Sequence, residues 1–130
     1  MRARRAGASA AEIVETHVSV IAFIGDRAYK LKKPVDLGFL DFSTRERREE
    51  ACRREVELNR RLAPDVYLRV LDVVDDAGRP VDHLVEMRRM PADARLSTLL
   101  HRDRDRAARG LRDVARLVAA FHASAPRSAA

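Results

Sequence analysis

All three lysines of this chain lie in one short stretch, residues 27–34, although the chain carries 26 basic residues. An ammonium is a compact point charge, whereas the guanidinium of arginine is a wide planar fork, so the two are poor substitutes for each other. The concentration of Lys30, Lys32 and Lys33 therefore indicates a site that needs an ammonium. Two simpler explanations stay open here: a chance cluster, or lysines that protect an edge strand from aggregation.

The lysines belong to a pattern that predicts a β-hairpin. Apolar side chains recur at every second position of residues 13–24, which is typical of a strand with one buried face. A Gly-Asp pair at 25–26 predicts a tight turn, and residues 27–33 then return as a second strand. Pro34 ends that strand, because proline has no N–H to give to the ladder. Alternation places three side chains on one face of the second strand: Ala28, Lys30 and Lys32.

A helix is predicted after the hairpin. Residues 35–42 are too apolar to lie free in water, so we expect a packed loop over the core. Ser43 and Glu46 then form a capping-box pattern, with Ser43 as the N-cap. The helix should run from there to about Leu62, where an Ala-Pro-Asp sequence stops it.

One carboxylate of this helix lies where an apolar side chain is expected. The buried stripe is marked by three residues: Ala51, Leu58 and Leu62. Glu55 falls on that stripe and needs a cationic partner. A local pair with Arg48 or Arg54 is the alternative to a partner from elsewhere in the fold.

The remainder of the chain predicts two more strands and two helices. Residues 66–74 and 81–88 alternate like strands, and turn residues lie between them. After Pro91, residues 96–101 predict a short helix, a charged connector follows, and residues 107–123 predict an amphipathic helix.

Composition narrows the classes of partner. The net charge of +6 over 130 residues favours anionic partners. Arginines are mixed with Asp and Glu in runs such as residues 45–50 and 102–106, as on solvated helix faces, so nucleic acid is the less favoured partner. The single cysteine, Cys52, forms no internal disulfide and fits the cytoplasm; at a helical position it is expected to be structural. The longest apolar run, residues 18–24, is too short to cross a bilayer. The four histidines show no metal-ligand spacing.

The order of the predicted elements resembles the N-terminal lobe of protein kinases, in which a strand lysine contacts the phosphates of ATP and a helix glutamate holds it by an ion pair. A longer ordered string resembles the start of bacterial aminoglycoside phosphotransferase-like proteins, whose kinase-like domain is often followed by a P-loop ATPase domain. The resemblance covers about residues 13–125. The string consists of Glu15-Thr16-His17, residues 25–44 (GDRAYKLKKPVDLGFLDFST), Glu55, residues 58–64 (LNRRLAP) and Tyr67.

The resemblance implies a nucleotide site. Lys30 matches the lysine that binds the nucleotide phosphates, and Glu55 matches its helix partner. Ala28 shares a strand face with Lys30 and is small enough to admit an adenine ring. The segment Glu86-Met87-Arg88 matches the hinge, whose main-chain groups would bind adenine. Residues 117–123 resemble the first long helix of the C-terminal lobe.

The sequence departs from the family where catalysis would need it. Family members carry a His-Gly-Asp catalytic loop, a following Asn and a metal-binding Asp beyond the long helix, and this sequence stops before them. No catalytic and no metal-binding residue is therefore assigned, and Mg²⁺ is expected only if the missing C-terminal lobe is supplied. His101-Arg102-Asp103 imitates the catalytic triplet but precedes the long helix, and Ala108 stands where the Asn should fall, so it is interpreted as a decoy.

These observations predict an α+β fold. A kinase-like N-terminal lobe, an antiparallel sheet with one packed helix, is expected at residues 13–90. The hinge exit and the first helices of a truncated C-terminal lobe are expected at 91–125, with disordered ends at 1–12 and 126–130.

The expected function is that of the ATP-binding lobe of a small-molecule kinase that is not competent alone, so whether the chain is an enzyme stays open. Its expected partners are a nucleotide and a missing C-terminal lobe or P-loop ATPase domain, with no membrane. The alternatives are a basic nucleic-acid-binding protein and a pseudokinase-like regulatory or interaction module.

Overall fold

The computed structural model describes residues 11–127, which form two compact units, one ending at Arg89 and one beginning at Met90. The first unit is a five-stranded antiparallel sheet with one helix, and the second is helical. The predicted α+β class is therefore confirmed. Most of the two ends expected to be disordered, residues 1–10 and 128–130, lies outside the described residues.

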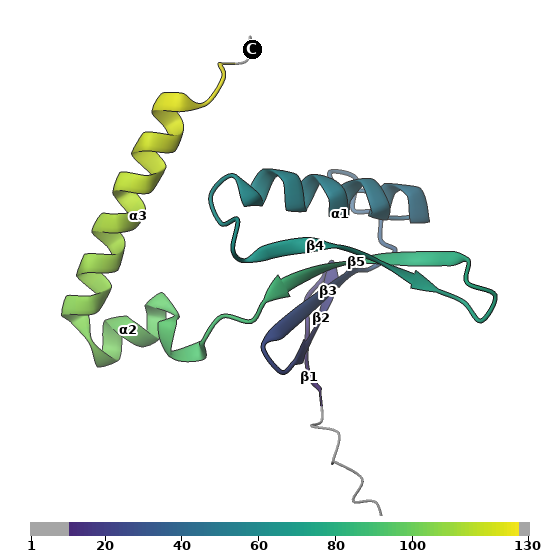
Figure 1. Cartoon of the computed structure of the whole chain (residues 1–130), viewed down its shortest axis with the longest axis horizontal. Coiled ribbons are helices and arrows are strands. Elements are labelled where there is room, and N and C mark those ends of the chain that lie inside the picture. Colours follow the sequence, from purple (N-terminus) through teal and green to yellow (C-terminus); the bar gives the residue numbers. More distant parts are fainter. Residues whose placement is uncertain (1–10, 128–130) are drawn as a thin grey trace, which may run out of the picture. The chain divides into compact units, whose positions relative to one another are not determined.

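The sheet has the strand order β1-β2-β3-β5-β4 (Figure 1), and every neighbouring pair is antiparallel. The first three strands form a meander, and the β4–β5 hairpin adds to it through pairing of β5 with β3. Strand β3 is therefore central, and β5 lies between β3 and β4 and is paired on both sides. The strands span Glu12–Glu15 (β1), Ser19–Ile24 (β2), Arg27–Lys32 (β3), Tyr67–Val74 (β4) and Pro80–Arg88 (β5).

Residues 13–24 form two strands rather than the single strand that the periodicity predicts. The side chain of Thr16 closes the turn between them, because its Oγ1 accepts a hydrogen bond from the Ser19 amide at 3.0 Å. The Thr16 amide in turn donates to the Ser19 carbonyl at 2.8 Å. A threonine turn carries a weaker sequence signal than glycine or proline. Glu12, which the sequence placed in the N-terminal tail, is the first residue of β1.

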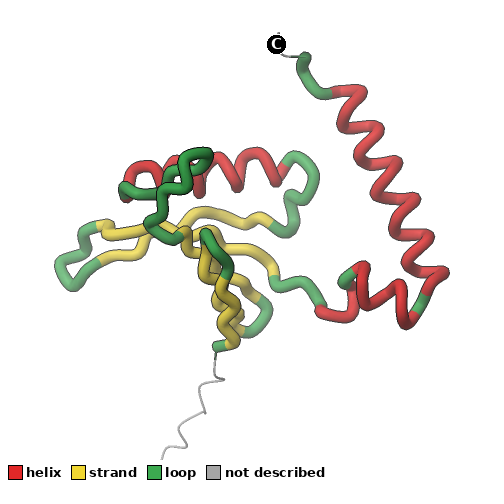
Figure 2. The backbone as a smooth tube through the Cα atoms, turned by 180° about the vertical axis from the view of Figure 1, so that it is seen from behind, coloured by secondary structure: helices red, strands yellow, loops and turns green. Residues whose placement is uncertain are grey.

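The segment between β3 and the following helix, drawn as a loop in Figure 2, is packed over only part of its length. Phe42 is buried, and its ring lies against the Lys32 ammonium at 5.0 Å from the ring centroid. Phe39 is 88% exposed, because it lies in a small excursion that a bridge between Asp36 and Asp41 closes. The expectation of a loop fully packed over the core is therefore wrong for its central residues.

Helix α1 (Arg45–Arg60) packs on β4 and β5 (Figure 1) and begins one residue later than predicted. Its N-cap is Thr44, whose Oγ1 accepts a hydrogen bond from the Arg47 amide at 3.2 Å. The Ser43 hydroxyl, expected to cap the helix, instead donates to the Asp41 carboxylate at 2.6 Å. The Ser43 hydroxyl is therefore engaged by Asp41 and does not cap the helix.

The buried face of α1 is polar rather than rich in leucine. Leu58 and Leu62 were expected on the buried stripe, but they are 41% and 40% exposed, because they lie at and beyond the last turn. The buried residues of the helix are Arg48 and Cys52. Arg48 donates to Asp82 on β5 at 2.9 Å. Cys52 is fully buried with its Sγ 3.9 Å from the His83 carbonyl oxygen, and this burial raises the pKa of the thiol. The contacts with β5 give both residues a structural role.

The second unit consists of a short 3₁₀ turn, η1 (Ala92–Ala94), and the helices α2 (Leu96–Arg102) and α3 (Arg104–Ser124). The charged connector expected between the helices is reduced to Asp103. Its carboxylate accepts a hydrogen bond from the Arg106 amide at 2.9 Å and caps α3. Within residues 11–127, no helix combines the length and the apolar character that a membrane crossing requires.

The observed cap can be tested with two neighbouring substitutions. Thr44→Ala should lower the free energy of unfolding by about 1 kcal/mol, because the Arg47 amide loses its acceptor. Ser43→Ala should cost less than about 0.5 kcal/mol, since this exposed hydroxyl does not cap the helix. Urea unfolding of both variants measures the difference, and a larger loss for Ser43→Ala would contradict the assignment.

Candidate functional site

The predicted contact between a strand lysine and a helix glutamate is present. Lys30 Nζ on β3 lies 2.9 Å from Glu55 Oε1 on α1. Lys32, two residues further along β3, lies 2.5 Å from the other oxygen, Oε2. The local alternative, a pair between Glu55 and Arg48 or Arg54, does not form, since Arg48 pairs with Asp82 and neither arginine is among the ion-pair partners of Glu55 in the described chain.

The topology explains why both lysines reach one carboxylate. Alternation along β3 puts Lys30 and Lys32 on the same face, and the register places Val85 of β5 directly opposite Lys30. Helix α1 packs on β5 and β4, so β3 is the next strand along. A long lysine side chain can bridge from that strand to the helix, whereas a short one could not.

The carboxylate of Glu55 is held in its ionised form. Partial burial raises its pKa, but hydrogen bonds from Lys32 and Lys30, together with their charges, outweigh burial and leave the pKa below the ordinary value of 4.5. Only 13% of the Glu55 side chain is exposed. The ion pairs, rather than contact with water, therefore stabilise the charge.

The cluster carries more positive than negative charge. Two ammoniums share one carboxylate, so one positive charge is left over where solvent is largely excluded. The two lysines differ in access, because 27% of the Lys30 side chain is exposed but only 6% of that of Lys32. Lys33 belongs to another contact, an ion pair with the exposed Glu15. Lys30 is therefore the member that an anionic ligand could reach.

Two further predicted site residues share the face of Lys30. Ala28 is 4% exposed and is paired across the ladder with Met87 of β5. Residues directly opposite in an antiparallel pair project from the same face, so Met87 lies on the side of Ala28 and Lys30. Ala28 and Met87 are therefore apolar neighbours of Lys30 on this face of the sheet.

The other two predicted hinge residues, Glu86 and Arg88, alternate with Met87 and so project from the opposite face. Glu86 is 6% exposed, and its carboxylate pairs with Arg69 at 2.5 Å and with Arg27 at 3.6 Å. This charge is occupied in holding β5 to both neighbouring strands.

The main chain of the predicted hinge is also engaged. Strand β5 pairs with β3 and β4 over this segment. The Arg88 amide donates to the Val66 carbonyl at 2.8 Å, and the Arg89 amide donates to the Asp26 carbonyl at 2.9 Å. Adenine binding by the hinge main chain stays a prediction, and the side chain of Met87 is the part of the segment that the structure brings to the face of Lys30.

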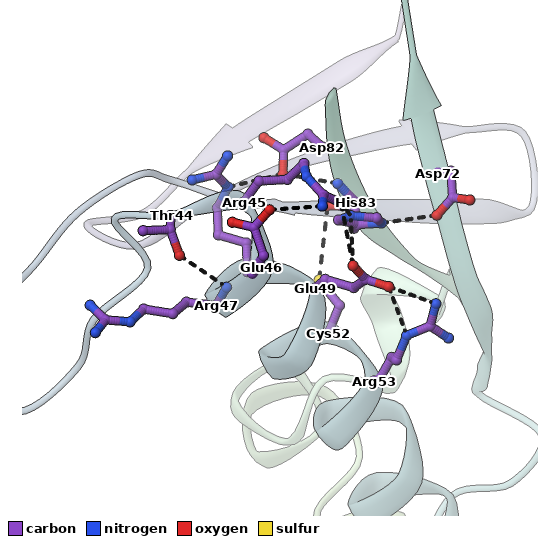
Figure 3. A network of polar contacts seen from close by, with 11 residues as sticks. Thr44, Arg45, Glu46, Arg47, Glu49, Cys52, Arg53, Asp72, Asp82 and His83 are labelled. Carbon is purple, nitrogen blue, oxygen red and sulfur yellow. Dashed lines mark hydrogen bonds and ion pairs between the residues drawn. The ribbon is translucent and has the colours of Figure 1, made fainter. Parts of the chain in front are cut away.

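Sequence reasoning missed one polar centre, at His83 on β5 (Figure 3). This ring is 2% exposed and lies between α1 and β4. Its Nε2 lies 2.9 Å from Arg45 Nη1, and its Nδ1 lies 2.9 Å from Asp72 Oδ1. Since a guanidinium only donates, Nε2 accepts and Nδ1–H donates to Asp72. The alternation of β5 placed His83 on the helix-facing side, which is the sequence signal that could have identified it.

Two other places do not reinforce the site. A depression on α1 is lined by charged helix residues that include none of the predicted site residues: Glu46, Glu49, Glu50, Arg53, Arg54 and Glu57. Asp103 of the imitated catalytic triplet caps α3, which gives it a structural role. Among residues 11–127, no group of three or more His, Cys, Asp or Glu side chains is arranged to hold a metal ion.

The chain is similar in sequence to part of several longer mycobacterial proteins. It is 45% identical over 89 residues to uncharacterized proteins of Mycobacterium bovis and of two strains of Mycobacterium tuberculosis. The match takes up 68% of this chain and 18% of each relative, so the chain spans less than a fifth of the curated relatives it matches. No protein-family model matches the chain, and no solved structure matches it.

The lowered pKa of Glu55 predicts a pH-dependent loss of stability. A depressed carboxyl pKa stabilises the fold above its ordinary value of 4.5, and this contribution is lost as the pH falls through the folded-state pKa. Glu55→Gln should therefore lower the free energy of unfolding by about 3 kcal/mol at neutral pH, because two ammoniums lose their partner. The difference in the free energy of unfolding between Glu55→Gln and wild type should shrink once the pH falls below the folded-state pKa of Glu55.

Urea unfolding of both proteins across the acid range measures this difference. Glu57→Gln is the matched control, because Glu57 is an exposed carboxylate of the same helix, and it should change stability by less than about 0.5 kcal/mol at any pH. A gap for Glu55→Gln that persists unchanged into strong acid would contradict the assigned ion pairs.

Proposed function

We propose that this chain supplies the ATP-binding lobe of a kinase-like phosphotransferase that resembles the aminoglycoside phosphotransferases and acts on a small molecule. The observation that carries this proposal is the ion pair between Lys30 of β3 and Glu55 of α1, at 2.9 Å. In kinase-like enzymes the same type of pair holds the lysine on the phosphates of ATP. Residues 13–90 would form the lobe, and residues 91–125 the hinge exit and the first helices of the C-terminal lobe.

The charge of the cluster supports an anionic ligand. The uncompensated ammonium of the Lys30–Lys32–Glu55 cluster would be neutralised by a phosphate oxygen, and the interaction would be stronger here than in bulk water because the surroundings are partly desolvated. Lys30 is partly exposed, so it can contact such a ligand while it stays near Glu55. A polyphosphate fits this arrangement better than a single carboxylate would, because it offers several oxygens.

The neighbouring side chains support a flat apolar group on the same ligand. Ala28 and Met87 lie opposite each other on the face of Lys30. Ala28 is 4% exposed without a ligand, so the flexible thioether of Met87 would have to move aside to admit an aromatic ring. An adenine ring above Ala28 with its phosphates at Lys30 is the pose that uses both features. The side chains of Glu86 and Arg88 take no part in it.

The chain would bind the nucleotide without carrying out the transfer. Phosphoryl transfer requires an aspartate that orients the acceptor hydroxyl and acidic residues that hold Mg²⁺, and none of the residues in the cluster can do either. A C-terminal lobe or a P-loop ATPase domain would supply what the cluster lacks, and the mycobacterial relatives have the additional length for one. The proposed location is the cytoplasm, where ATP is available.

Mg-ATP should stabilise the chain through Lys30. At an ATP concentration about tenfold above Kd, binding adds about 1.4 kcal/mol, which raises Tm by about 4 °C for a chain of this size. Lys30→Met should abolish the rise, because the phosphates lose their cation. Thermal unfolding with and without Mg-ATP measures both.

Lys33→Met provides the control, since it removes the same charge from a lysine that pairs with the exposed Glu15 instead of Glu55. It should keep the full response to Mg-ATP. Equal responses in wild type and Lys30→Met would refute the proposal. A duplex oligonucleotide that binds with a steep salt dependence, with no response to ATP, would favour the nucleic-acid alternative.

A further inference from the structure

The two lysines that contact Glu55 differ in the oxygen they bind and in how exposed they are. Each binds its own oxygen, Lys30 at Oε1 and Lys32 at Oε2, so one carboxylate can hold both at once. The Lys30 side chain is 27% exposed, whereas that of Lys32 is 6% exposed. The same strand face thus presents one accessible ammonium and one enclosed ammonium.

Lys32 is enclosed on several sides. The ring of Phe42 lies 5.0 Å from its ammonium, in the geometry of a cation–π contact. Phe42 is itself buried, and so is Ser19, which pairs with Lys32 across the β2–β3 ladder. An ammonium in this position cannot turn towards a ligand in solution without leaving both the Glu55 carboxylate and the Phe42 ring.

The consequence for Lys30 is that it can shift towards a ligand without leaving Glu55 unpaired. If Glu55 had Lys30 as its single cation, a ligand that drew Lys30 away would leave the carboxylate unpaired and partly buried, which is costly. With Lys32 in place, Glu55 keeps a charge-assisted hydrogen bond whatever Lys30 does. Helix α1 would then keep its place over the sheet with or without a ligand.

We propose that Lys32 is a positioning residue: it anchors Glu55, and through it helix α1, while Lys30 alone serves the ligand. The identity of that ligand as a nucleotide rests on the proposed function, but the division between the two lysines does not. It is a property of the chain without nucleotide and can be measured there.

The test compares Lys32→Met with Lys30→Met, the same substitution at two positions that contact one carboxylate. Without nucleotide, Lys32→Met should lower Tm by about 8 °C, and Lys30→Met by about 2 °C or less. Adding Glu55→Gln to Lys32→Met should lower Tm much less than Glu55→Gln does in the wild type, since the contact is already lost. An equal or larger loss for Lys30→Met would overturn the proposal.

Lys32→Arg separates charge from packing. It keeps a cation beside Glu55, but the wider guanidinium has less room beside Phe42, so it should recover part of the Tm that Lys32→Met loses. Methionine already keeps the aliphatic bulk of lysine, so a loss for Lys32→Arg as large as that for Lys32→Met would show that a cation at this position does not anchor Glu55 and would overturn the proposal. If Lys32→Met fails to fold, the Tm values of Lys30→Met and Lys32→Arg still decide the question in the same way.

A chemical readout reports positioning rather than stability. In folded Lys32→Met, Lys30 becomes the sole partner of Glu55, so acetic anhydride should label Lys30 severalfold more slowly than in the wild type, with Lys33 as the internal reference. An unchanged labelling rate would overturn the proposal. These measurements contain no nucleotide, so a chain that ignores Mg-ATP would refute the proposed function and leave this inference to be decided by its own results.

Discussion

The carboxylate of Glu55 between two ammoniums is the interaction on which the arrangement of the first unit depends. It joins α1 to β3, a strand on which the helix does not principally pack, and so ties the helix to the meander as well as to the β4–β5 hairpin. The effect of such a contact on stability is asymmetric. Forming it gains little over an apolar packing of the same shape, whereas removing one member leaves a desolvated charge without a partner.

The helix relies on contacts of this kind because its apolar surface is small. Cys52 is its one fully buried apolar side chain within the described chain, and it is accompanied by buried Arg48. From the first turn of α1 to Glu55, polar side chains connect the helix to the sheet: Arg45 to His83, Arg48 to Asp82, and Glu55 to the lysines. Hydrogen bonds and ion pairs are directional, so they restrict the position and rotation of a helix more than apolar packing does. This suits a helix that must hold one carboxylate in place.

The use of lysine in a chain otherwise full of arginine has a physical explanation in this geometry. Two ammoniums approach the two oxygens of one carboxylate, and each is a compact group on a flexible stem. Two guanidinium forks would each favour both oxygens at once and would crowd each other. Phe42 adds a further restriction, since it leaves the enclosed cation little room. The site therefore explains why Lys30 and Lys32 are lysines, whereas Lys33 follows β3 and pairs with Glu15.

Much of the fold was predictable because it depends on local chemistry. The strands β3, β4 and β5 follow alternating side chains and turn residues, and α1 follows its capping residues and the Pro64 stop to within about two residues. The errors came from competition between local groups. Thr16 closed a turn that the periodicity ran through, Asp41 took the hydroxyl of Ser43, and the ends of α1 left Leu58 and Leu62 exposed.

The sequence by itself determined that Lys30 and Lys32 share a strand face and that Glu55 needs a cation, because side-chain periodicity follows from backbone geometry alone. Only the tertiary structure decided that both lysines meet this glutamate, 25 and 23 residues away along the chain, and that one of them is enclosed and the other open. The same holds for His83 and Glu86, whose partners come from other strands and from the helix. Which charges meet across a sheet depends on strand order and helix placement, and no local pattern encodes these.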